Sequence, residues 1–271
     1  MKTLIPVVSL LLASCTTYLG KQKFEHQKDA FYAGNTEERQ KGEVYIPEGK
    51  GPFPGVVVVH GGGWDSRDFE DMNSVSKSLA SHGFVVYNIN YRLAPKHRHP
   101  APIEDLKTAL AYFKKNADKF KLDPKRIGLW GYSSGGHTVS SYALLHAGQE
   151  DLKVQAVVAG GTPFDFTWYD QSPIIKSYLG KLRDDMLKEY YAASPMFMVT
   201  DQAPPFYLYH AKEDKLVEFA QSMAFAARLK SHSVPVETHK IGWWGHATAL
   251  IFSEEAVVEG IKFMQKRLNE K

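Results

Sequence analysis

A serine stands between two glycines in the segment Gly-Tyr-Ser-Ser-Gly at residues 131–135. The segment 126–130 before it is typical of a short buried strand, and the helical spacing of apolar residues in 136–146 predicts a helix after it. In so tight a strand-to-helix turn the residues beside the serine must be small, because strand and helix nearly touch there. The hydroxyl is then lifted out of the fold, near the positive end of the helix. The segment therefore predicts a nucleophile at Ser133.

A glycine run could supply the matching oxyanion hole. His60-Gly61-Gly62-Gly63-Trp64 follows directly after the apolar run 55–59. Bare glycine backbone lets successive N–H groups converge on one developing negative charge, and losing one such donor typically slows a reaction about 100- to 1000-fold. A further donor in such sites is the N–H of the residue after the nucleophile, here Ser134. The alternative interpretation of the run is a flexible turn.

An acid and a base also follow expected strands. Asp214 comes shortly after the apolar run 205–209, and a carboxylate at the carboxyl end of a parallel strand can turn inward to hold a histidine ring. The neighbouring Glu213 is the alternative acid. His246 follows the last expected strand and is the candidate general base. The chain order Ser133, Asp214, His246 is that of α/β-hydrolases and differs from the other serine hydrolase folds.

Several other functions are not expected. His97 and His99 could suggest a metal ion, but no carboxylate or cysteine set completes a site, so neither a metal nor a cofactor is predicted. The glycines at 61–63 lack the Lys-Ser/Thr that would follow in a phosphate-binding loop. The formal net charge of +3 is small and its lysines and arginines are scattered, which argues against a nucleic-acid partner.

From residue 42 onward, short apolar runs alternate with amphipathic stretches. Strands are expected at 43–46, 55–59, 84–89, 126–130, 154–158, 205–209 and 236–241, and helices at 72–82, 103–120, 136–146, 219–229 and 254–268. This alternation predicts a mostly parallel twisted sheet with helices on both faces. Residues 43–46 are expected at the sheet edge, stopped by Pro47.

The range 161–199 is the exception to this alternation, and it is rich in aromatic residues. We expect it to form a small insertion over the site. Its aromatic side chains either pack ordinarily in the core or form the wall of a substrate pocket, and the sequence favours neither.

The first residues are expected to be a targeting segment. Lys2 precedes an apolar run at 4–12 that is too short to cross a bilayer as a mature helix. The following Leu12-Ala13-Ser14-Cys15 resembles the lipobox of bacterial lipoproteins, which implies cleavage of residues 1–14 and lipidation of Cys15. Cys15 is the only cysteine, so no internal disulfide is possible. The alternative is an ordinary secretory signal with an incidental cysteine.

This resemblance implies a location in the bacterial cell envelope, with the lipid anchor on Cys15 binding the membrane. The residue after the cysteine is Thr16 rather than Asp. In enterobacterial lipoproteins, a residue other than Asp at this position implies the outer membrane. Residues 15–40 are expected to be the lipidated cysteine and a polar tether, because 21–40 is polar and poorly periodic. Residues 41–271 are expected to form one α/β-hydrolase domain. The chain as a whole is 44% hydrophobic, which is enough for a full core.

From about residue 45 to 263 the chain resembles the α/β-hydrolase carboxylesterases related to hormone-sensitive lipase, including their acetyl-ester and carbohydrate-esterase-like members. The resemblance rests on four segments taken together: His60-Gly-Gly-Gly-Trp64, Tyr91-Arg92-Leu93-Ala94-Pro95, Asp123-Pro124-Lys125-Arg126-Ile127 leading to the elbow, and the segment from His210 to Val217.

The resemblance implies an α/β-hydrolase fold with Ser133, Asp214 and His246 as a catalytic triad. It favours Asp214 over Glu213, and Gly62 and Gly63 as the oxyanion donors beside Ser134. Many members have Asp and Ala on either side of the elbow serine, where this chain has Tyr132 and Ser134. That difference moves the resemblance toward the secreted carbohydrate-esterase-like members. The long amino-terminal cap helices of the family are missing.

The expected function is therefore a serine esterase acting on a small-molecule ester with a short acyl chain, through an acyl-enzyme. An aryl formamidase of the kynurenine formamidase kind is the first alternative, because those enzymes also carry an HGG-x-W stretch. A peptidase is less favoured, since such relatives usually carry a large extra domain. Outside the enzymes, the alternative is a non-catalytic surface lipoprotein on the same fold.

Overall fold

The structure, a computed structural model, describes residues 20–34, 38–243 and 245–269. The expected signal peptide at 1–14 and the expected lipidation site at Cys15 lie outside the described residues, so both stay predictions. Within the described ranges, no helix has the length and apolar character needed to span a bilayer.

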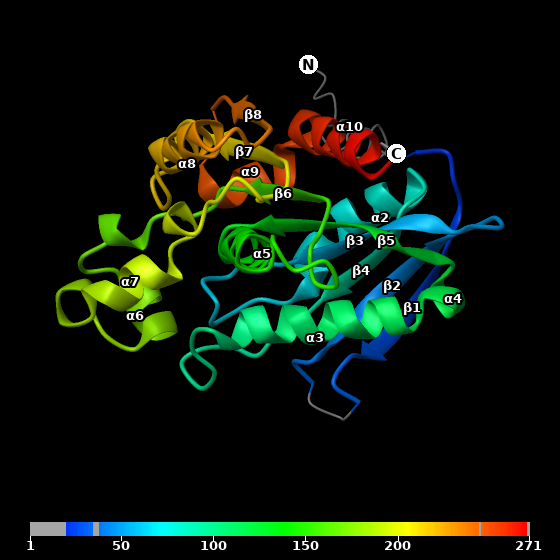
Figure 1. Ribbon diagram of the computed structural model, residues 1–271, viewed down its shortest axis with the longest axis horizontal. Helices are drawn as coiled ribbons and strands as arrows, with labels where there is room; N and C mark the ends of the chain where they lie inside the picture. Colours follow the sequence, from blue (N-terminus) through cyan, green and yellow to red (C-terminus); the bar gives the residue numbers. More distant parts are fainter. Residues whose placement is uncertain (1–19, 35–37, 244, 270–271) are drawn as a thin grey trace, which may run out of the picture.

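One eight-stranded sheet runs through the molecule in the order β1-β2-β4-β3-β5-β6-β7-β8 (Figure 1). Its strands are β1 (Phe24–Phe31), β2 (Lys41–Pro47), β3 (Phe53–Val59), β4 (Val85–Ile89), β5 (Leu122–Tyr132), β6 (Ala156–Gly160), β7 (Phe206–Ala211) and β8 (Val236–Ile241). The pairs β1–β2 and β2–β4 are antiparallel, and every other pair is parallel. The carboxyl ends of β3 to β8 therefore meet at one edge of the sheet, where ligands bind in such folds.

Helices cover both faces of the sheet (Figure 1). On one face lie α3 (Ala101–Lys115), the short α4 (Ala117–Phe120), α5 (Ser134–Leu145) and α8 (Phe219–Ser231). On the other lie α2 (Asn73–Ser81), preceded by the 3₁₀ turn η1 (Phe69–Met72), and α9 (His246–Phe252) and α10 (Glu254–Asn269). The two layers make two separate hydrophobic clusters, one on each side of the strands.

The unbroken apolar run of β3 is explained by its burial on both faces. Val56 and Val58 belong to the cluster under α2 and α10, whereas Val57 and Val59 belong to the cluster under α3 and α5. All four side chains are fully buried. Successive side chains of a strand point to opposite faces, so a strand covered on both sides needs apolar residues at every position.

Two expectations for the beginning of the chain are wrong. Residues 24–31, expected in the tether, form β1, and residues 43–46, expected at the edge, lie in β2 between β1 and β4. Backbone pairing with β2 holds β1 in place, together with the edge-on contact of Phe24 with Tyr45 and the burial of Ala30. Most of the other β1 side chains are exposed or half-buried, which explains why its sequence is polar.

The insertion expected at 161–199 lies between β6 and β7 and projects to one side of the sheet (Figure 1). It contains α6 (Pro173–Leu179), α7 (Leu187–Ala193) and the 3₁₀ turns η2 (Phe166–Trp168), η3 (Arg183–Asp185) and η4 (Pro195–Phe197). Some of its aromatic residues take each of the two expected roles. Phe164, Phe166, Tyr178 and Tyr190 are fully buried, whereas Tyr169 lines a cavity beside Ser133.

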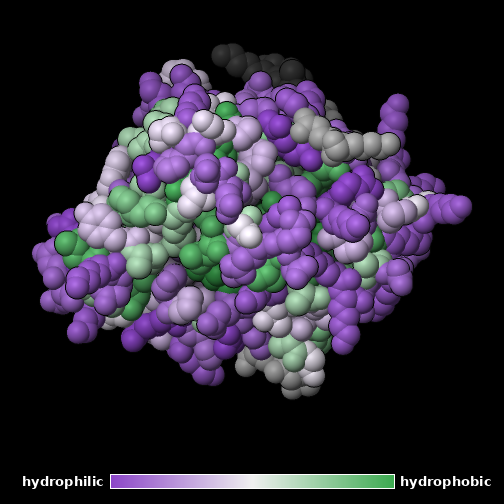
Figure 2. Space-filling view, in the orientation of Figure 1, coloured by the Kyte–Doolittle hydropathy of each residue, from purple (hydrophilic) through white to green (hydrophobic). Residues whose placement is uncertain are grey.

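Hydrophobic side chains also reach the surface of the insertion. Hydrophilic residues cover most of the face seen in Figure 2, and hydrophobic ones show mainly on the side of the insertion and near the middle of the molecule. In the insertion, the exposed large hydrophobic residues are Trp168, Leu187, Tyr191 and Phe197.

Helix α10 packs so closely on the sheet that replacing its Gly260 by alanine should destabilise the fold. A Cβ on Gly260 would lie 2.5 Å from the ring of Trp130, which is fully buried on β5. We therefore expect Gly260→Ala to lower the free energy of unfolding by about 1–3 kcal/mol through overpacking, although alanine is the better helix former. Gly242→Ala is the control, because a Cβ there meets nothing within 4 Å. Urea denaturation measures both, and a stabilised Gly260→Ala would contradict this packing.

Candidate active site

Ser133 occupies the sharp turn between β5 and α5. Its backbone has φ 54° and ψ −123°, a left-handed conformation that is strained for any residue with a side chain. Gly131 and Gly135, on either side of this turn, have no room for a side chain. A Cβ on Gly131 would overlap the backbone of Gly135, and one on Gly135 would overlap the carbonyl groups of Val59 and His60. This close packing therefore keeps the serine in its strained conformation at the tip of the turn.

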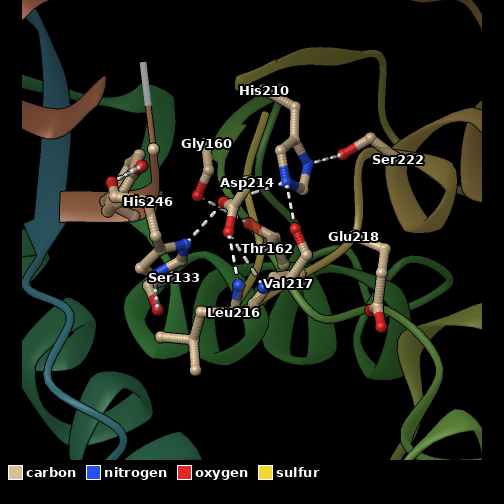
Figure 3. A network of polar contacts seen from close by, with 12 residues as sticks. Ser133, Gly160, Thr162, His210, Asp214, Leu216, Val217, Glu218, Ser222 and His246 are labelled. Carbon is tan, nitrogen blue, oxygen red and sulfur yellow. Dashed lines mark hydrogen bonds and ion pairs between the residues drawn. The ribbon is translucent and has the colours of Figure 1, made fainter. Parts of the chain in front are cut away.

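The structure brings Ser133, His246 and Asp214 together (Figure 3). His246 Nε2 lies 2.8 Å from Ser133 Oγ, and His246 Nδ1 lies 2.6 Å from Asp214 Oδ2. An ionised carboxylate can only accept hydrogen bonds, so the proton of the neutral ring sits on Nδ1. Nε2 is then free to accept the hydroxyl proton of Ser133. His246 is the first residue of α9, a helix that was not among those expected from the sequence.

Asp214 is built into the loop after β7. Its side chain is buried, and Oδ1 accepts hydrogen bonds from the backbone N–H groups of Leu216 at 2.9 Å and Val217 at 3.0 Å. Burial opposes ionisation, but hydrogen bonds from His210, His246 and Val217 outweigh it and hold the pKa of Asp214 well below the usual carboxyl range. The alternative acid, Glu213, is exposed.

A second histidine, which the sequence did not point out as functional, supports Asp214. His210 Nε2 lies 2.8 Å from the carbonyl oxygen of Val217 and 3.2 Å from Asp214 Oδ2 (Figure 3). Both of these oxygens only accept, so Nε2 carries the proton, and Nδ1 accepts from the hydroxyl of Ser222 at 2.7 Å. The only sequence signal for this role is the separation of four residues between His210 and Asp214.

Tyr132 connects the turn at Ser133 to the backbone of His246. Its hydroxyl donates a hydrogen bond of 2.6 Å to the backbone carbonyl of His246, 114 residues away in the chain. Burial raises the pKa of Tyr132, so the phenol keeps its proton and stays a donor. This contact gives a structural role to Tyr132, the residue directly before Ser133.

The glycine run lies beside Ser133 in the same cavity. Gly62 has φ 108° and Gly63 has φ 62°, conformations that glycine adopts without steric cost. Within the described part of the chain, neither N–H group donates a hydrogen bond to another residue. Both are thus free to meet a developing negative charge. The assignment of Gly62, Gly63 and Ser134 as the oxyanion donors stays a prediction.

Ser133 lines two cavities. The smaller, of about 80 Å³, is mostly apolar, and the insertion forms part of its wall through Tyr169, Ile174 and Ile175. The larger, of about 350 Å³, reaches His246 and the polar side chains that follow the glycine run. Gly63, Ile174 and Leu216 border both cavities. Among the residues that the structure describes, no group of three or more His, Cys, Asp or Glu is placed to hold a metal ion.

Several hydrolases are similar to this chain in sequence. The chain is 32% identical over 201 residues to Esterase LipC of Mycobacterium tuberculosis, covering 67% of this chain and 49% of that protein. It spans about half the length of this relative and of two further esterase relatives from the same organism, LipM and LipQ. A kynurenine formamidase of Meyerozyma guilliermondii is 27% identical over 205 residues, 70% of this chain and 77% of that one.

Solved structures confirm the expected α/β-hydrolase fold. A truncated carbohydrate esterase from gut microbiota superimposes with a TM-score of 0.84 at 21% identity, covering 92% of this chain and 98% of that chain. The profile of the BD-FAE family matches residues 43–229, which is more than half of the chain. The matched region includes the glycine run, Ser133 and Asp214 and ends before His246. On this match, the chain belongs to the BD-FAE family.

Proposed function

We propose that this protein is a serine esterase that hydrolyses short-chain carboxylic esters through an acyl-enzyme. The observation that carries the proposal is the continuous hydrogen-bonded path from Ser133 Oγ through the His246 ring to the buried carboxylate of Asp214. The Esterase LipC relative supports ester hydrolysis as the reaction class.

The proposed reaction has two halves. His246 Nε2 removes the hydroxyl proton as Ser133 Oγ attacks the ester carbonyl carbon, and Asp214 stabilises the imidazolium that forms. The resulting oxyanion accepts hydrogen bonds from the N–H groups of Gly62, Gly63 and Ser134. When the carbon–oxygen bond to the leaving group breaks, His246 returns the proton to the departing alcohol. Water then attacks the acyl-enzyme with His246 again as the base, which releases the acid and restores Ser133.

The two cavities can be assigned from this proton transfer. The leaving oxygen must lie against His246 to receive its proton, so the alcohol part occupies the larger cavity, which His246 lines. The acyl part then occupies the smaller cavity, which Ser133 and Ser134 line without His246. A volume of about 80 Å³ favours short acyl groups.

A second candidate reaction is hydrolysis of an aryl formamide. Two observations favour it: the kynurenine formamidase relative, and the small acyl cavity, since formyl is the smallest acyl group. Comparing kcat/KM for N-formylkynurenine with that for acetyl esters distinguishes the two reactions. Labelling by a fluorophosphonate probe separates either enzyme from a non-catalytic scaffold, which should stay unlabelled.

The first prediction from this proposal concerns the nucleophile. Ser133→Ala should lower kcat for p-nitrophenyl acetate by more than about 10⁴-fold and abolish fluorophosphonate labelling, with the far-UV circular dichroism unchanged. Ser140→Ala is the matched control, because Ser140 is buried on α5, the helix that follows Ser133, and its hydroxyl bonds to no described residue. Turnover retained by the Ser133 variant would remove this residue from the mechanism.

The second prediction concerns Asp214. Asp214→Asn should lower kcat by about 10⁴-fold, because an amide can hold His246 in the wrong tautomer. The ionised native carboxylate also contributes stability at neutral pH. That contribution should fade as the pH drops below about 4, because carboxyls of the unfolded chain take up protons there while native Asp214 does not.

Urea denaturation at pH 7, 5 and 3 measures this effect. The difference in unfolding free energy between wild type and Asp214→Asn should narrow from pH 5 to pH 3. The exposed Asp201 supplies the control variant Asp201→Asn, for which no such narrowing is expected. A difference that stays constant over this range would argue against an Asp214 that remains ionised in acid.

The third prediction concerns acyl length. Wild type should prefer p-nitrophenyl acetate to the octanoate, and Ile174→Ala should raise the octanoate-to-acetate ratio of kcat/KM by about tenfold or more, because it enlarges the acyl cavity. Leu187→Ala, an exposed position of the same insertion, should leave the ratio unchanged. If Ile174→Ala keeps the wild-type ratio, the smaller cavity does not hold the acyl chain.

A further inference from the structure

We propose that Arg39 is a positioning residue for the oxyanion site: it selects the tautomer of His60, and His60 in turn fixes the peptide that carries the N–H of Gly62. The proposal rests on the proposed function, because it concerns the same reaction. Arg39 lies just before β2, in the range that the sequence predicted to be a tether.

The Arg39 guanidinium joins three segments around the glycine run. Its Nε donates to the carbonyl of Tyr91 at 3.1 Å, and its Nη2 donates to the carbonyl of Arg67 at 3.0 Å. Nη2 also lies 3.3 Å from His60 Nε2. A guanidinium has five N–H donors and no acceptor, so in this contact His60 Nε2 must be the acceptor.

His60 therefore carries its proton on the other ring nitrogen. The side chain is fully buried, and burial together with the Arg39 cation lowers its pKa to about 3, so the ring is neutral near neutral pH. With Nε2 accepting from Arg39, Nδ1 holds the single proton and donates it to the carbonyl of Gly61 at 2.6 Å. Arg39 thus makes His60 a donor toward the glycine run.

The bond to Gly61 orients the next N–H group. In a trans peptide the carbonyl oxygen and the following N–H point in opposite directions. Holding the Gly61 oxygen against the buried ring therefore turns the Gly62 N–H away from the ring, toward the cavity that Gly62 lines beside Ser133. Tyr91 stabilises the same arrangement, since its ring stacks on His60 at 4.4 Å and its hydroxyl lies 3.4 Å from the Gly61 oxygen.

The chain around Arg39 is anchored well enough for this role. The Gln40 carbonyl accepts from the N–H of Tyr32, the Lys41 carbonyl accepts from the N–H of Asn90, and the Gln40 side chain donates to Asp105 at 2.8 Å. Without Arg39, His60 could place its proton on Nε2 instead. The bare Nδ1 would then face the Gly61 oxygen, and the peptide between Gly61 and Gly62 would lose what holds its orientation.

Kinetics of two Arg39 variants test the proposal. Arg39→Ala removes the side chain, and Arg39→Met keeps most of its stem while losing every donor. Rates are expressed per active site titrated with a fluorophosphonate, so that unfolded protein does not count. The kcat of each variant should fall about 10- to 100-fold, which is at most the effect of removing one oxyanion donor. KM should change less than threefold. Gln40→Ala is the matched control, because it loosens the same segment without touching His60.

A trifluoromethyl ketone separates positioning from a merely structural role. It forms a tetrahedral oxyanion on the serine, so its Ki should weaken in the Arg39 variants by the same factor as kcat/KM falls, and stay unchanged in Gln40→Ala. Wild-type kcat and Ki per titrated site in both Arg39 variants would overturn the proposal. So would an equal loss in Gln40→Ala.

The tautomer of His60 can be observed independently of any activity. Long-range ¹H–¹⁵N spectra of histidine-labelled protein, assigned with a His60→Gln variant, should show the His60 proton on Nδ1 in the wild type and a shift toward Nε2 in Arg39→Met. A wild-type ring protonated on Nε2, or a variant that keeps the wild-type tautomer, would overturn the proposal. If the wild type shows the expected tautomer but no hydrolysis, the proposed function fails while the link from Arg39 to His60 stands.

Discussion

The close approach of β3, β5 and α5 is the constraint on which the rest of the site depends. Gly131 and Gly135 let the strand, the helix and the carbonyl groups of Val59 and His60 come within a distance that excludes any side chain. The turn that lifts the Ser133 hydroxyl therefore also lies against the segment where the glycine run begins. The proposed nucleophile and the proposed oxyanion donors are therefore placed by one packing contact. A substitution at Gly135 would disturb both, although its side chain would touch neither the base nor the acid.

A second principle operates around this contact: histidines are oriented by partners that can only donate or only accept. The Asp214 carboxylate places the proton of His246 on Nδ1, and the acceptors Val217 and Asp214 place that of His210 on Nε2. Each ring then has one direction of donation, and a neutral imidazole is ready to act without first changing its tautomer. Burial shields the Asp214 carboxylate from solvent, while its hydrogen bonds keep it ionised.

Local features of the site could be predicted from the sequence, and long-range ones could not. The strained turn at Ser133 and the glycine run each need particular residue types within one short segment, so both can be recognised directly in the sequence. The contact from Tyr132 to the His246 carbonyl spans 114 residues, and nothing in the local pattern of either segment indicates it. The strand β1 was missed for a related reason: it is held by backbone pairing to β2 while most of its side chains face solvent, so its polar sequence looks like a tether. Helix α9 was missed because its seven residues are few for a periodic pattern to show.

Catalysis and substrate range draw on different parts of this fold. The groups proposed to make and break bonds lie at the carboxyl ends of β3, β5 and β7 and at the start of α9, where the parallel sheet holds them rigidly. The wall between the two cavities includes Ile174 from the insertion and Leu216 from the loop beyond Asp214. In the proposed reaction the leaving group lies on the side of His246, so that wall sets how much room the proposed acyl group has. A change in the length or packing of α6 can therefore alter which acyl groups fit while the path from Ser133 to Asp214 stays intact. The insertion is thus free to vary with the substrate, whereas the glycines beneath Ser133 are not.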